Sequence, residues 1–248
     1  MTQPPAHLFR RRLFVRGYEL LTSQRFWRAH AARLLDVAGD AAYAGRDGAA
    51  TLRVLDLGCG PGESTFALVD ALAERGQRAH VVGLDFAAAG IARARDVQLR
   101  RLRADADAAT GAFLVADAAH LPVPDDHVDL VTGHSFLYLL PDADAVLRAA
   151  HRALRPDGVA VFMEPARGRL RDAAAQLDAD SRRRALRHPL AALRFAGSMV
   201  TWRRFSGRRA RFDAPRLDAL LRRAGFADVD VAPTLGGLAL HARGRRRA

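Results

Sequence analysis

Short apolar runs that end at glycine or aspartate alternate along the chain with longer segments whose apolar residues recur at helical spacing. The runs predict strands over 52–57, 80–85, 112–116, 128–133 and 158–164. The periodic segments, each closed by a breaker such as glycine or proline, predict helices over 63–75, 87–104 and 142–154. Alternation of this kind is typical of βαβ units, so the pattern predicts a mainly parallel sheet with helices on both faces.

The C-terminal part of the pattern departs from this rhythm. Asp213 can cap a helix over 216–224, and short strands are predicted at 228–232 and 237–242. The segment between these two strands is too short for a crossover helix, so we expect an antiparallel pair that closes the sheet.

The composition fits a globular chain of 248 residues. Half of the residues are hydrophobic, which argues against disorder, yet no apolar run reaches the ~18–20 residues of a membrane-spanning helix. Residues 1–12 carry charges without an apolar block behind them, so we expect no secretory signal. Cys59 is the one cysteine and cannot form an internal disulfide, so we predict a cytoplasmic location. The histidines lack metal-ligand spacing, and no metal is predicted.

The charge is strongly positive, at a formal +12. The chain contains no lysine and no asparagine, a bias typical of a GC-rich genome, which explains the use of arginine but not its excess. That excess is concentrated in residues 9–12, 167–211 and 243–247. A solvated basic surface is the simplest interpretation, while attraction to phosphate-bearing substrates, anionic lipid or RNA stays open.

The first predicted strand runs directly into a glycine-rich turn. Asp56 near its end is followed by Gly58, Gly60 and Gly62, and a periodic apolar segment comes next. Glycines at a strand-to-helix turn allow positive φ and let a ligand approach the backbone closely. Their alternate spacing differs from the Gly-x-Gly-x-x-Gly of dinucleotide-binding folds, so it indicates another nucleotide-like ligand.

The next two predicted strands also end in acidic residues, at the sheet edge where open α/β folds bind ligands. Asp85 can accept hydrogen bonds from both hydroxyls of a ribose, and a helix N-cap role is compatible with that. Asp117 can accept from the exocyclic amine of adenine or form a plain turn. Phe86 either packs on an adenine face or fills core. In register with Asp56, these residues indicate a bound nucleoside.

Together these stretches resemble the class I S-adenosylmethionine (SAM) methyltransferases, especially the branch of the ubiquinone/menaquinone C-methyltransferases (methyltransferase type 11). The resemblance covers residues 52–165 closely, through VLDLGCGPGE, VVGLDF, ADAAHLPVPDDHVDLVTGHSFLYLL and LRAAHRALRPDGVAVFMEP. A weaker echo lies at Tyr18 and Trp27. The resemblance to the family implies a Rossmann-like α/β fold with a seven-stranded, mainly parallel sheet and an antiparallel final strand. It also implies N-terminal helices and a helical insertion after the fifth strand.

The resemblance also implies a domain organisation and a cofactor site. Residues 1–248 would form one class I methyltransferase domain, with a helical cap (1–48), a SAM-binding core (49–165), a helical insertion or lid (166–212) and a C-terminal helix and strands (213–248). The SAM contacts would come from Asp56, Gly58, Cys59, Gly60, Gly62, Asp85, Phe86, Asp117, Ala118, Gly133 and His134. In such families the glycine loop contacts the methionyl part of SAM, and S-adenosylhomocysteine is the product.

Methyl transfer from a sulfonium is an in-line displacement, so an enzyme mainly positions the nucleophile and shields the site. A general base is needed only for an acceptor that is protonated at rest. His134, after the fourth strand, is the candidate catalytic base, with a structural role or a backbone contact to SAM as the alternative. Tyr138 either lines the substrate site or caps the next helix, and Glu164 either faces the substrate or pairs with an arginine.

We expect the acceptor under the least regular segments. Residues 12–35 carry apolar residues at helical spacing, and residues 166–212 are arginine-rich and helical in pattern, without a clear strand. Several large side chains there form either a lid over a flat or lipid-like acceptor or ordinary core, namely Tyr18, Trp27, Phe195, Met199, Trp202 and Phe205. Arg203 and Arg204 either bind an acidic group of the acceptor or are solvated.

The sequence therefore predicts methyl transfer from SAM to a small organic acceptor of aromatic, quinone-like or lipid-like kind. The fourth strand lacks an Asn/Asp-Pro-Pro-aromatic sequence, which argues against amino-group methylation of nucleic-acid bases or glutamine. An RNA methyltransferase, motivated by the net charge, and a non-catalytic SAM-fold binding protein are the alternatives. Peripheral membrane contact and the oligomeric state stay open.

Overall fold

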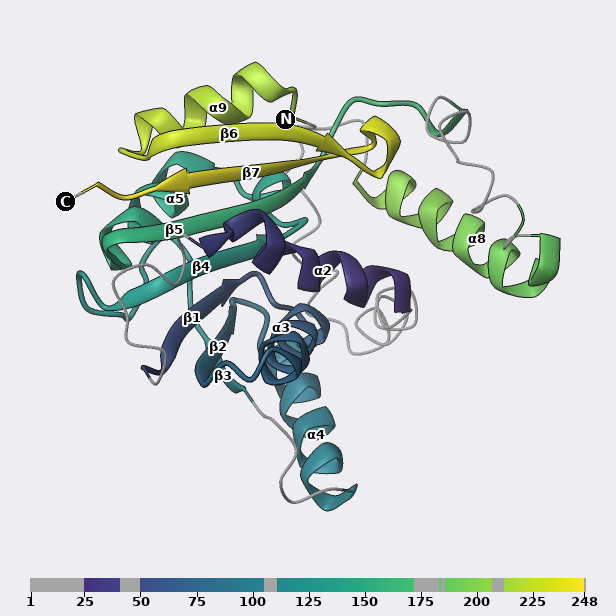
Figure 1. Ribbon diagram of the computed structural model, residues 1–248, viewed down its shortest axis with the longest axis horizontal. Coiled ribbons are helices and arrows are strands. Elements are labelled where there is room, and N and C mark those ends of the chain that lie inside the picture. The colour runs from purple at the N-terminus through teal and green to yellow at the C-terminus, as the bar shows by residue number, and fades with distance from the viewer. Residues whose placement is uncertain are drawn as a thin grey trace.

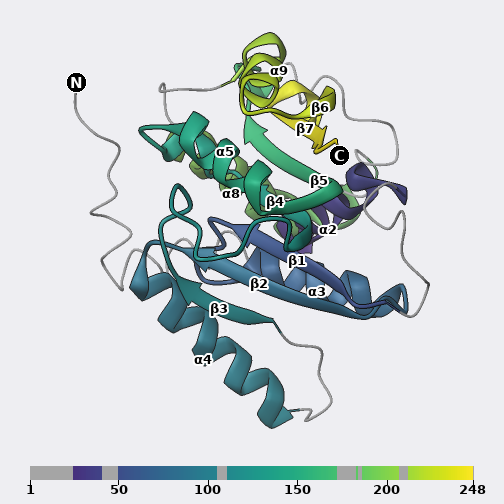
Figure 2. The same cartoon turned by 90° about the vertical axis from the view of Figure 1, so that its left-hand side faces the viewer.

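A computed structural model describes residues 25–40, 50–104, 111–171, 183, 186–206 and 212–247 of the chain. Within these residues, seven strands form one sheet in the order β3-β2-β1-β4-β5-β7-β6 (Figures 1 and 2). Their bounds are β1 Leu52–Leu57, β2 Ala79–Asp85, β3 Ala112–Val115, β4 Val128–His134, β5 Leu154–Pro165, β6 Ala227–Thr234 and β7 Ala239–Arg245. The predicted fold class is confirmed.

The strand pairing is parallel from β3 through to β5 and antiparallel on both sides of β7. The predicted antiparallel closure of the sheet is therefore confirmed. The strand order reverses between β1 and β4, which are neighbours in the sheet and run in the same direction. At such a switch point the loops after the two strands diverge and leave a crevice at their carboxyl ends.

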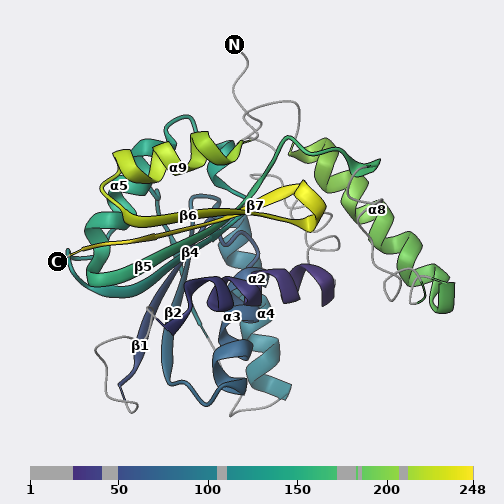
Figure 3. The same cartoon turned by 45° about the horizontal axis from the view of Figure 1, so that its top comes forward.

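Helices cover both faces of the sheet (Figure 3). Their bounds are α2 Arg25–Ala38, α3 Glu63–Glu74, α4 Ala88–Ala104, α5 Ala143–Ala153, α8 Pro189–Phe205 and α9 Ala214–Arg223, with short 3₁₀ turns at η2 Leu137–Leu139 and η3 Leu235–Gly237. No helix among the described residues is long and apolar enough to cross a bilayer.

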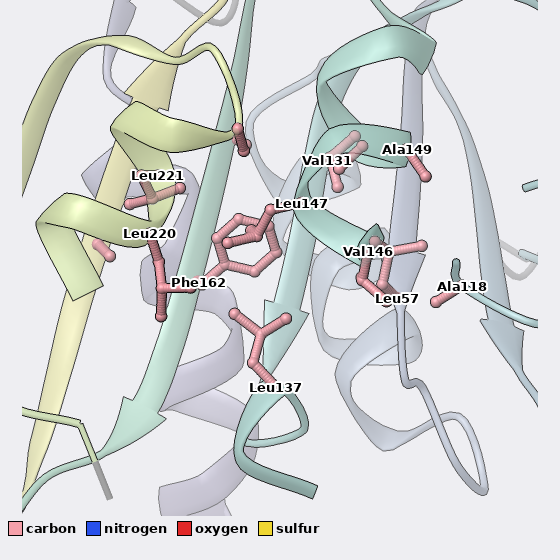
Figure 4. Close-up of a cluster of buried hydrophobic side chains, with 14 of the residues drawn as sticks. Leu57, Ala118, Val131, Leu137, Val146, Leu147, Ala149, Phe162, Leu220 and Leu221 are labelled. Carbon is pink, nitrogen blue, oxygen red and sulfur yellow. The ribbon is translucent and has the colours of Figure 1, made fainter. Parts of the chain in front are cut away.

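Three hydrophobic core clusters form among the described residues, and the two largest lie on opposite faces of the sheet. Figure 4 shows the first, in which α5 and α9 pack on the sheet through side chains such as Leu147, Leu221 and Phe162. The second joins α2 and α3 to the opposite face through Leu34, Leu68 and their neighbours. Each helix supplies apolar residues at helical spacing, so the periodicity that predicted the helices is also what buries them.

Aspartates cap the starts of two helices, and the sequence predicted the cap at Asp213. Asp213 accepts a hydrogen bond from the Arg216 amide at 3.0 Å, and Asp142 accepts one from the Ala145 amide at 2.9 Å. Each side chain satisfies one of the amides that lack a partner in the first turn of a helix.

The bounds of β5 and β7 differ most from the prediction. β5 begins at Leu154 instead of 158, because Val128 of β4 pairs with Leu154 before the register shifts, so the Pro-Asp-Gly turn signal forms an irregularity inside the strand. β7 runs over Ala239–Arg245 instead of 237–242, because residues 235–237 form the turn η3. Of the predicted N-terminal helix 12–35, residues 12–24 lie outside the described part of the chain.

Candidate functional site at the carboxyl edge of the sheet

The glycine loop links β1 to α3 with three left-handed glycines. Gly58, Gly60 and Gly62 have φ of 68°, 52° and 90°. A Cβ on Gly58 would lie 2.5 Å from Cγ of Phe136, so the loop packs against the chain there. A Cβ on Gly60 would have no heavy atom within 4 Å. The loop therefore exposes bare backbone at Gly60, a cradle that any side chain would partly fill.

Asp56 lies beneath this loop and is fully buried. Its carboxylate accepts hydrogen bonds from the hydroxyls of Ser64 and Thr65, each at 2.7 Å, and of Thr132 at 3.0 Å. Burial raises the pKa of Asp56 to about 6, against the effect of these donors. The residue thus ties the start of α3 to β4, and within the described chain it acts as a support for the loop.

Asp85, at the end of β2, supports the loop from the other side. Its Oδ2 accepts from the Gly60 amide at 2.9 Å, and its Oδ1 accepts from the Ala87 amide at 2.8 Å, just before α4. Burial raises the pKa of this carboxyl group. One side chain therefore fixes both the cradle and the start of the next helix, a link across 25 residues.

Exposed apolar surface lies beside Asp85. Phe86 is 47% exposed, and Val115, the strand partner of Asp85 on β3, is 43% exposed. Solvated apolar side chains at the ends of two neighbouring strands form a surface that a flat ring can cover.

Asp117 and Ala118 follow β3 in a turn. Oδ1 of Asp117 accepts from the Ala119 amide at 2.9 Å, and Oδ2 lies 2.9 Å from Nδ1 of His120. The hydrogen bond from the Ala119 amide, followed by the one with His120, lowers the pKa of Asp117. These contacts fit the predicted alternative, in which Asp117 forms a plain turn. The carboxylate remains exposed, at the same carboxyl ends of the strands as the apolar surface of Phe86 and Val115. Ala118 is buried below it.

Cys59 is a buried filler inside the loop. Burial, followed by the nearby carboxylates of Asp56 and Asp85, raises the pKa of its thiol well above the ordinary value. The thiol therefore stays protonated and unreactive at neutral pH.

The loop after β4 is held from below by Glu164. This residue is the last but one of β5 and is fully buried, and its carboxylate accepts hydrogen bonds from the amides of Phe136 at 3.0 Å, Leu137 at 2.9 Å and Tyr138 at 3.3 Å. Burial raises its pKa to about 8, against these three donors. Among the described residues its hydrogen-bond partners are these amides and not an arginine, so the side chain caps the first amides of η2, and a contact with the substrate stays a prediction.

Tyr138 lies within η2 and is buried in the core on the α5 side. The cap of the following helix α5 is Asp142, so that alternative for Tyr138 is wrong.

An aromatic wall stands above the end of β4, where α2 and α8 meet. The rings of Trp27 and Trp202 lie 5.3 Å apart between centroids, and Nε1 of Trp202 donates to Oγ of Ser135 at 3.1 Å. The rings of Phe195 and Phe26 pack with their centroids 4.4 Å apart. Trp27, Phe195, Met199 and Trp202 thus gather on one side of the sheet, as predicted for either a lid or a core. Tyr18 and the side chains of Arg204 and Phe205 lie outside the described residues.

Arg203 differs from both of its expected roles. The guanidinium is buried and donates to the carbonyl oxygens of Ala166 at 2.8 Å and Leu238 at 3.4 Å, and to that of Gly168. It fastens the end of α8 to the segments after β5 and before β7.

Three histidines meet between α2 and the sheet, and the sequence pattern identified only His134. His134 ends β4, with Gly133 before it, and its ring meets Trp27 edge to face at 6.1 Å. His134 pairs in register with Met163, which pairs with His241 of β7, and His30 of α2 interacts with both histidines. Nδ1 of His30 and Nε2 of His134 and His241 are buried without a hydrogen-bond partner among the described residues.

The histidine cluster is electrically neutral at physiological pH. Burial is the main cause that lowers the pKa of His30 to about 4 and of His134 to about 3, and it also lowers that of His241. His30 and His241 carry no motif; the only sequence signal is a histidine on the apolar side of a helix or strand. Among the described residues, no group of three His, Cys, Asp or Glu side chains is arranged to hold a metal.

The fold and the loop define a nucleoside-binding α/β domain, and a comparison with family models makes this specific. A model described as a methyltransferase domain matches residues 49–200. The chain belongs to this methyltransferase family, and the resemblance to class I SAM methyltransferases is confirmed.

Individual relatives match the same part of the chain. A 2-phytyl-1,4-naphtoquinone methyltransferase of Synechococcus elongatus is 38% identical over 112 residues, which is 45% of each chain. A demethylmenaquinone methyltransferase of Lactobacillus johnsonii is 36% identical over 44% of this chain and 42% of its own. The matches thus span less than half the length of these curated relatives.

A solved structure shares the fold over nearly the whole chain. Phosphoethanolamine N-methyltransferase 2 of Haemonchus contortus, in complex with S-adenosyl-L-methionine, superposes with a TM-score of 0.59 at 17% identity, over 90% of this chain and 44% of that one. At this identity the likeness concerns the fold alone.

Proposed function

We propose that this chain is a SAM-dependent methyltransferase that acts on a small organic acceptor. The observation that carries the proposal is the open cradle at Gly60, held by Asp85 at the switch point between β1 and β4. Membership of the methyltransferase family supports it.

The residues at this edge suit each part of the cofactor. The glycine loop would take the methionyl part, Asp85 the ribose hydroxyls, and Phe86 with residues 117–118 the adenine ring. Gly133 and His134 would border the sulfonium end. Bound SAM supplies the electrophilic methyl group. Asp56 would act as a positioning residue, since its oxygens already bond to three hydroxyls of the chain.

The acceptor would lie against the aromatic wall near His134. Trp27 and Trp202, buried and in contact with each other, form the apolar wall there, and the relatives that carry naphtoquinone and menaquinone in their names support an aromatic, quinone-like acceptor. A His134 pKa of about 3 makes proton uptake by this ring unfavourable. We therefore assign His134 to hydrogen bonding of an acceptor oxygen in preference to the role of general base.

A matched pair of glycine substitutions tests the cofactor site. Gly60 and Gly76 have similar φ, 52° and 65°, and a Cβ on either meets no heavy atom within 4 Å. Gly60→Ala and Gly76→Ala should therefore lose similar stability, about 1 kcal/mol each from left-handed strain. Only Gly60→Ala should weaken SAM binding, by at least about tenfold, as measured by titration calorimetry.

The wild-type protein must bind SAM and S-adenosylhomocysteine in the same measurement. A folded protein that binds neither would overturn the proposal, and so would equal affinities for the two variants.

The other candidate functions remain predictions. Incubation with SAM labelled in its methyl group, together with total RNA or with a set of naphthols and quinols, separates them. Label in RNA would support an RNA methyltransferase, whereas binding of SAM without transfer to any acceptor would support a non-catalytic binding protein.

A further inference from the structure

Helix α8 has two faces of different character. Its inner face carries Phe195, Met199 and Trp202 and packs on α2 and the sheet. Its outer face carries Leu190, Leu193 and Val200, which are 78%, 70% and 45% exposed. These three residues fall at helical spacing with Gly197 between them, so they form one continuous stripe, called here the outer stripe.

The outer stripe stands out from the rest of the described surface. The three most exposed large apolar side chains among the described residues are Leu186, Leu190 and Leu193. A single exposed leucine needs no explanation, but an aligned row of them marks an interaction surface. Figures 1 and 3 show that α8 extends away from the sheet, so its outer face is available to a large partner.

The described charged side chains of α8 and the two residues before it are arginines. Arg187 and Arg194 are exposed beside the outer stripe. Residues 181–210 contain nine arginines and no aspartate or glutamate. A helix with an apolar stripe next to arginines is suited to an interface that is apolar inside and anionic at its surface.

We propose that the outer face of α8 docks on an anionic membrane surface. Leu190, Leu193 and Val200 enter the boundary between lipid headgroups and acyl chains, and Arg187 and Arg194 contact lipid phosphates. A second copy of the chain fits this face poorly, because the arginines of the two copies would then face one another and repel.

Docking in this orientation has a consequence for access to the site. The inner face of α8 contacts the aromatic wall through Trp202, so the membrane would lie next to the acceptor side of the molecule. This consequence rests on the proposed function, whereas the docking itself does not. An apolar acceptor could then pass from the bilayer to the site without crossing water.

Vesicle flotation with the full chain tests the proposal. We expect the wild type to float with phosphatidylcholine vesicles that contain ~30% phosphatidylglycerol, and to bind pure phosphatidylcholine or high-salt samples much less. The double variant Leu190→Glu/Leu193→Glu should lose at least about tenfold in partitioning, because it removes two inserted side chains and adds repelled charges.

Leu99→Glu is the matched control, since Leu99 is 53% exposed on α4, which packs along β2 and β3. It should float like the wild type. Equal flotation of the double variant would overturn the proposal, as would failure of the wild type to bind anionic vesicles. A wild-type dimer that the double variant abolishes, seen by light scattering, would also overturn it in favour of self-association. SAM affinity, measured separately, should be unchanged in all three proteins and reports on the cofactor site alone.

Discussion

Glu164 shows how one buried side chain shapes the loop that borders the site. Its carboxylate accepts from three consecutive amides that lie 26 to 28 residues away in the sequence. The sequence shows an acidic residue at the end of an apolar run, but this pattern is equally compatible with binding a ligand and with capping backbone amides. Only the packing of β4 against β5 distinguishes the two, so sequence reasoning could not.

Removal of this cap should destabilise the protein. Glu164→Ala leaves three buried amides without an acceptor and should lower the free energy of unfolding by about 3 kcal/mol. Glu74→Ala, an exposed position at the end of α3, is the control and should change it by less than about 0.5 kcal/mol. Urea denaturation measures both. A loss in Glu164→Ala no larger than in the control would contradict the assigned role.

The pH dependence of Glu164 follows from its raised pKa. The folded pKa of about 8 lies above the ordinary 4.5, so the fold favours the protonated carboxyl. Its contribution is complete below about pH 4.5 and is lost as the pH rises towards 8. We expect the stability difference between wild type and Glu164→Gln to shift against the wild type between pH 5 and 8. A difference independent of pH would contradict the raised pKa.

At the scale of elements, the sequence predicts what depends on neighbours in the chain. The capping Asp213 and the left-handed glycines act within a few residues, so their patterns predicted α9 and the loop. The link from Asp85 to Gly60 and the meeting of His30 with His241 depend on which strands become neighbours. Sequence periodicity does not specify those contacts.

The docking of α2 should weaken in acid. His30, His134 and His241 face one another between α2, β4 and β7, with Arg33 of α2 as the nearby charged group. Their folded pKa values lie below 6.5, so their neutral forms stabilise the fold above pH 6.5, and this contribution is lost as the pH falls towards 4 and 3.

Hydrogen exchange measures this effect. After correction for intrinsic rates, amides of α2 should lose protection between pH 7 and pH 5, while those of α5 on the other face change less. The variant His30→Phe should reduce the loss in α2. Equal changes in both helices would mean that the histidines do not control the docking of α2.

At the scale of the whole molecule, residues at the two ends of the strands have different roles. The proposed site lies at the carboxyl ends of the strands, while Asp129 lies near the opposite edge, at the start of β4. There it accepts from the Arg53 amide at 2.7 Å and from Nε of Arg155 at 2.6 Å. This buried carboxylate holds the starts of three strands together.

Substitution of Asp129 should lower the stability of the fold without changing the affinity for SAM. Asp129→Ala should lower the free energy of unfolding by about 2 kcal/mol, less than for a fully buried ion pair because both arginines reach solvent. SAM affinity at a temperature where the variant is folded should stay within about twofold of the wild type. A large loss of affinity in the folded variant would show that the edges are coupled.

The hydrogen bond from Trp202 to Ser135 joins α8 to the loop after β4. Anything that favours one position of α8 is therefore linked to the arrangement of that loop. Thermodynamic linkage is reciprocal, so if a lipid surface on the outside of α8 strengthens acceptor binding on the inside, a bound acceptor strengthens lipid binding by the same factor. A bound acceptor on the inner face of α8 would then strengthen membrane binding at its outer face. Trp202→Phe, which removes the hydrogen-bond donor, would reduce this coupling in both directions.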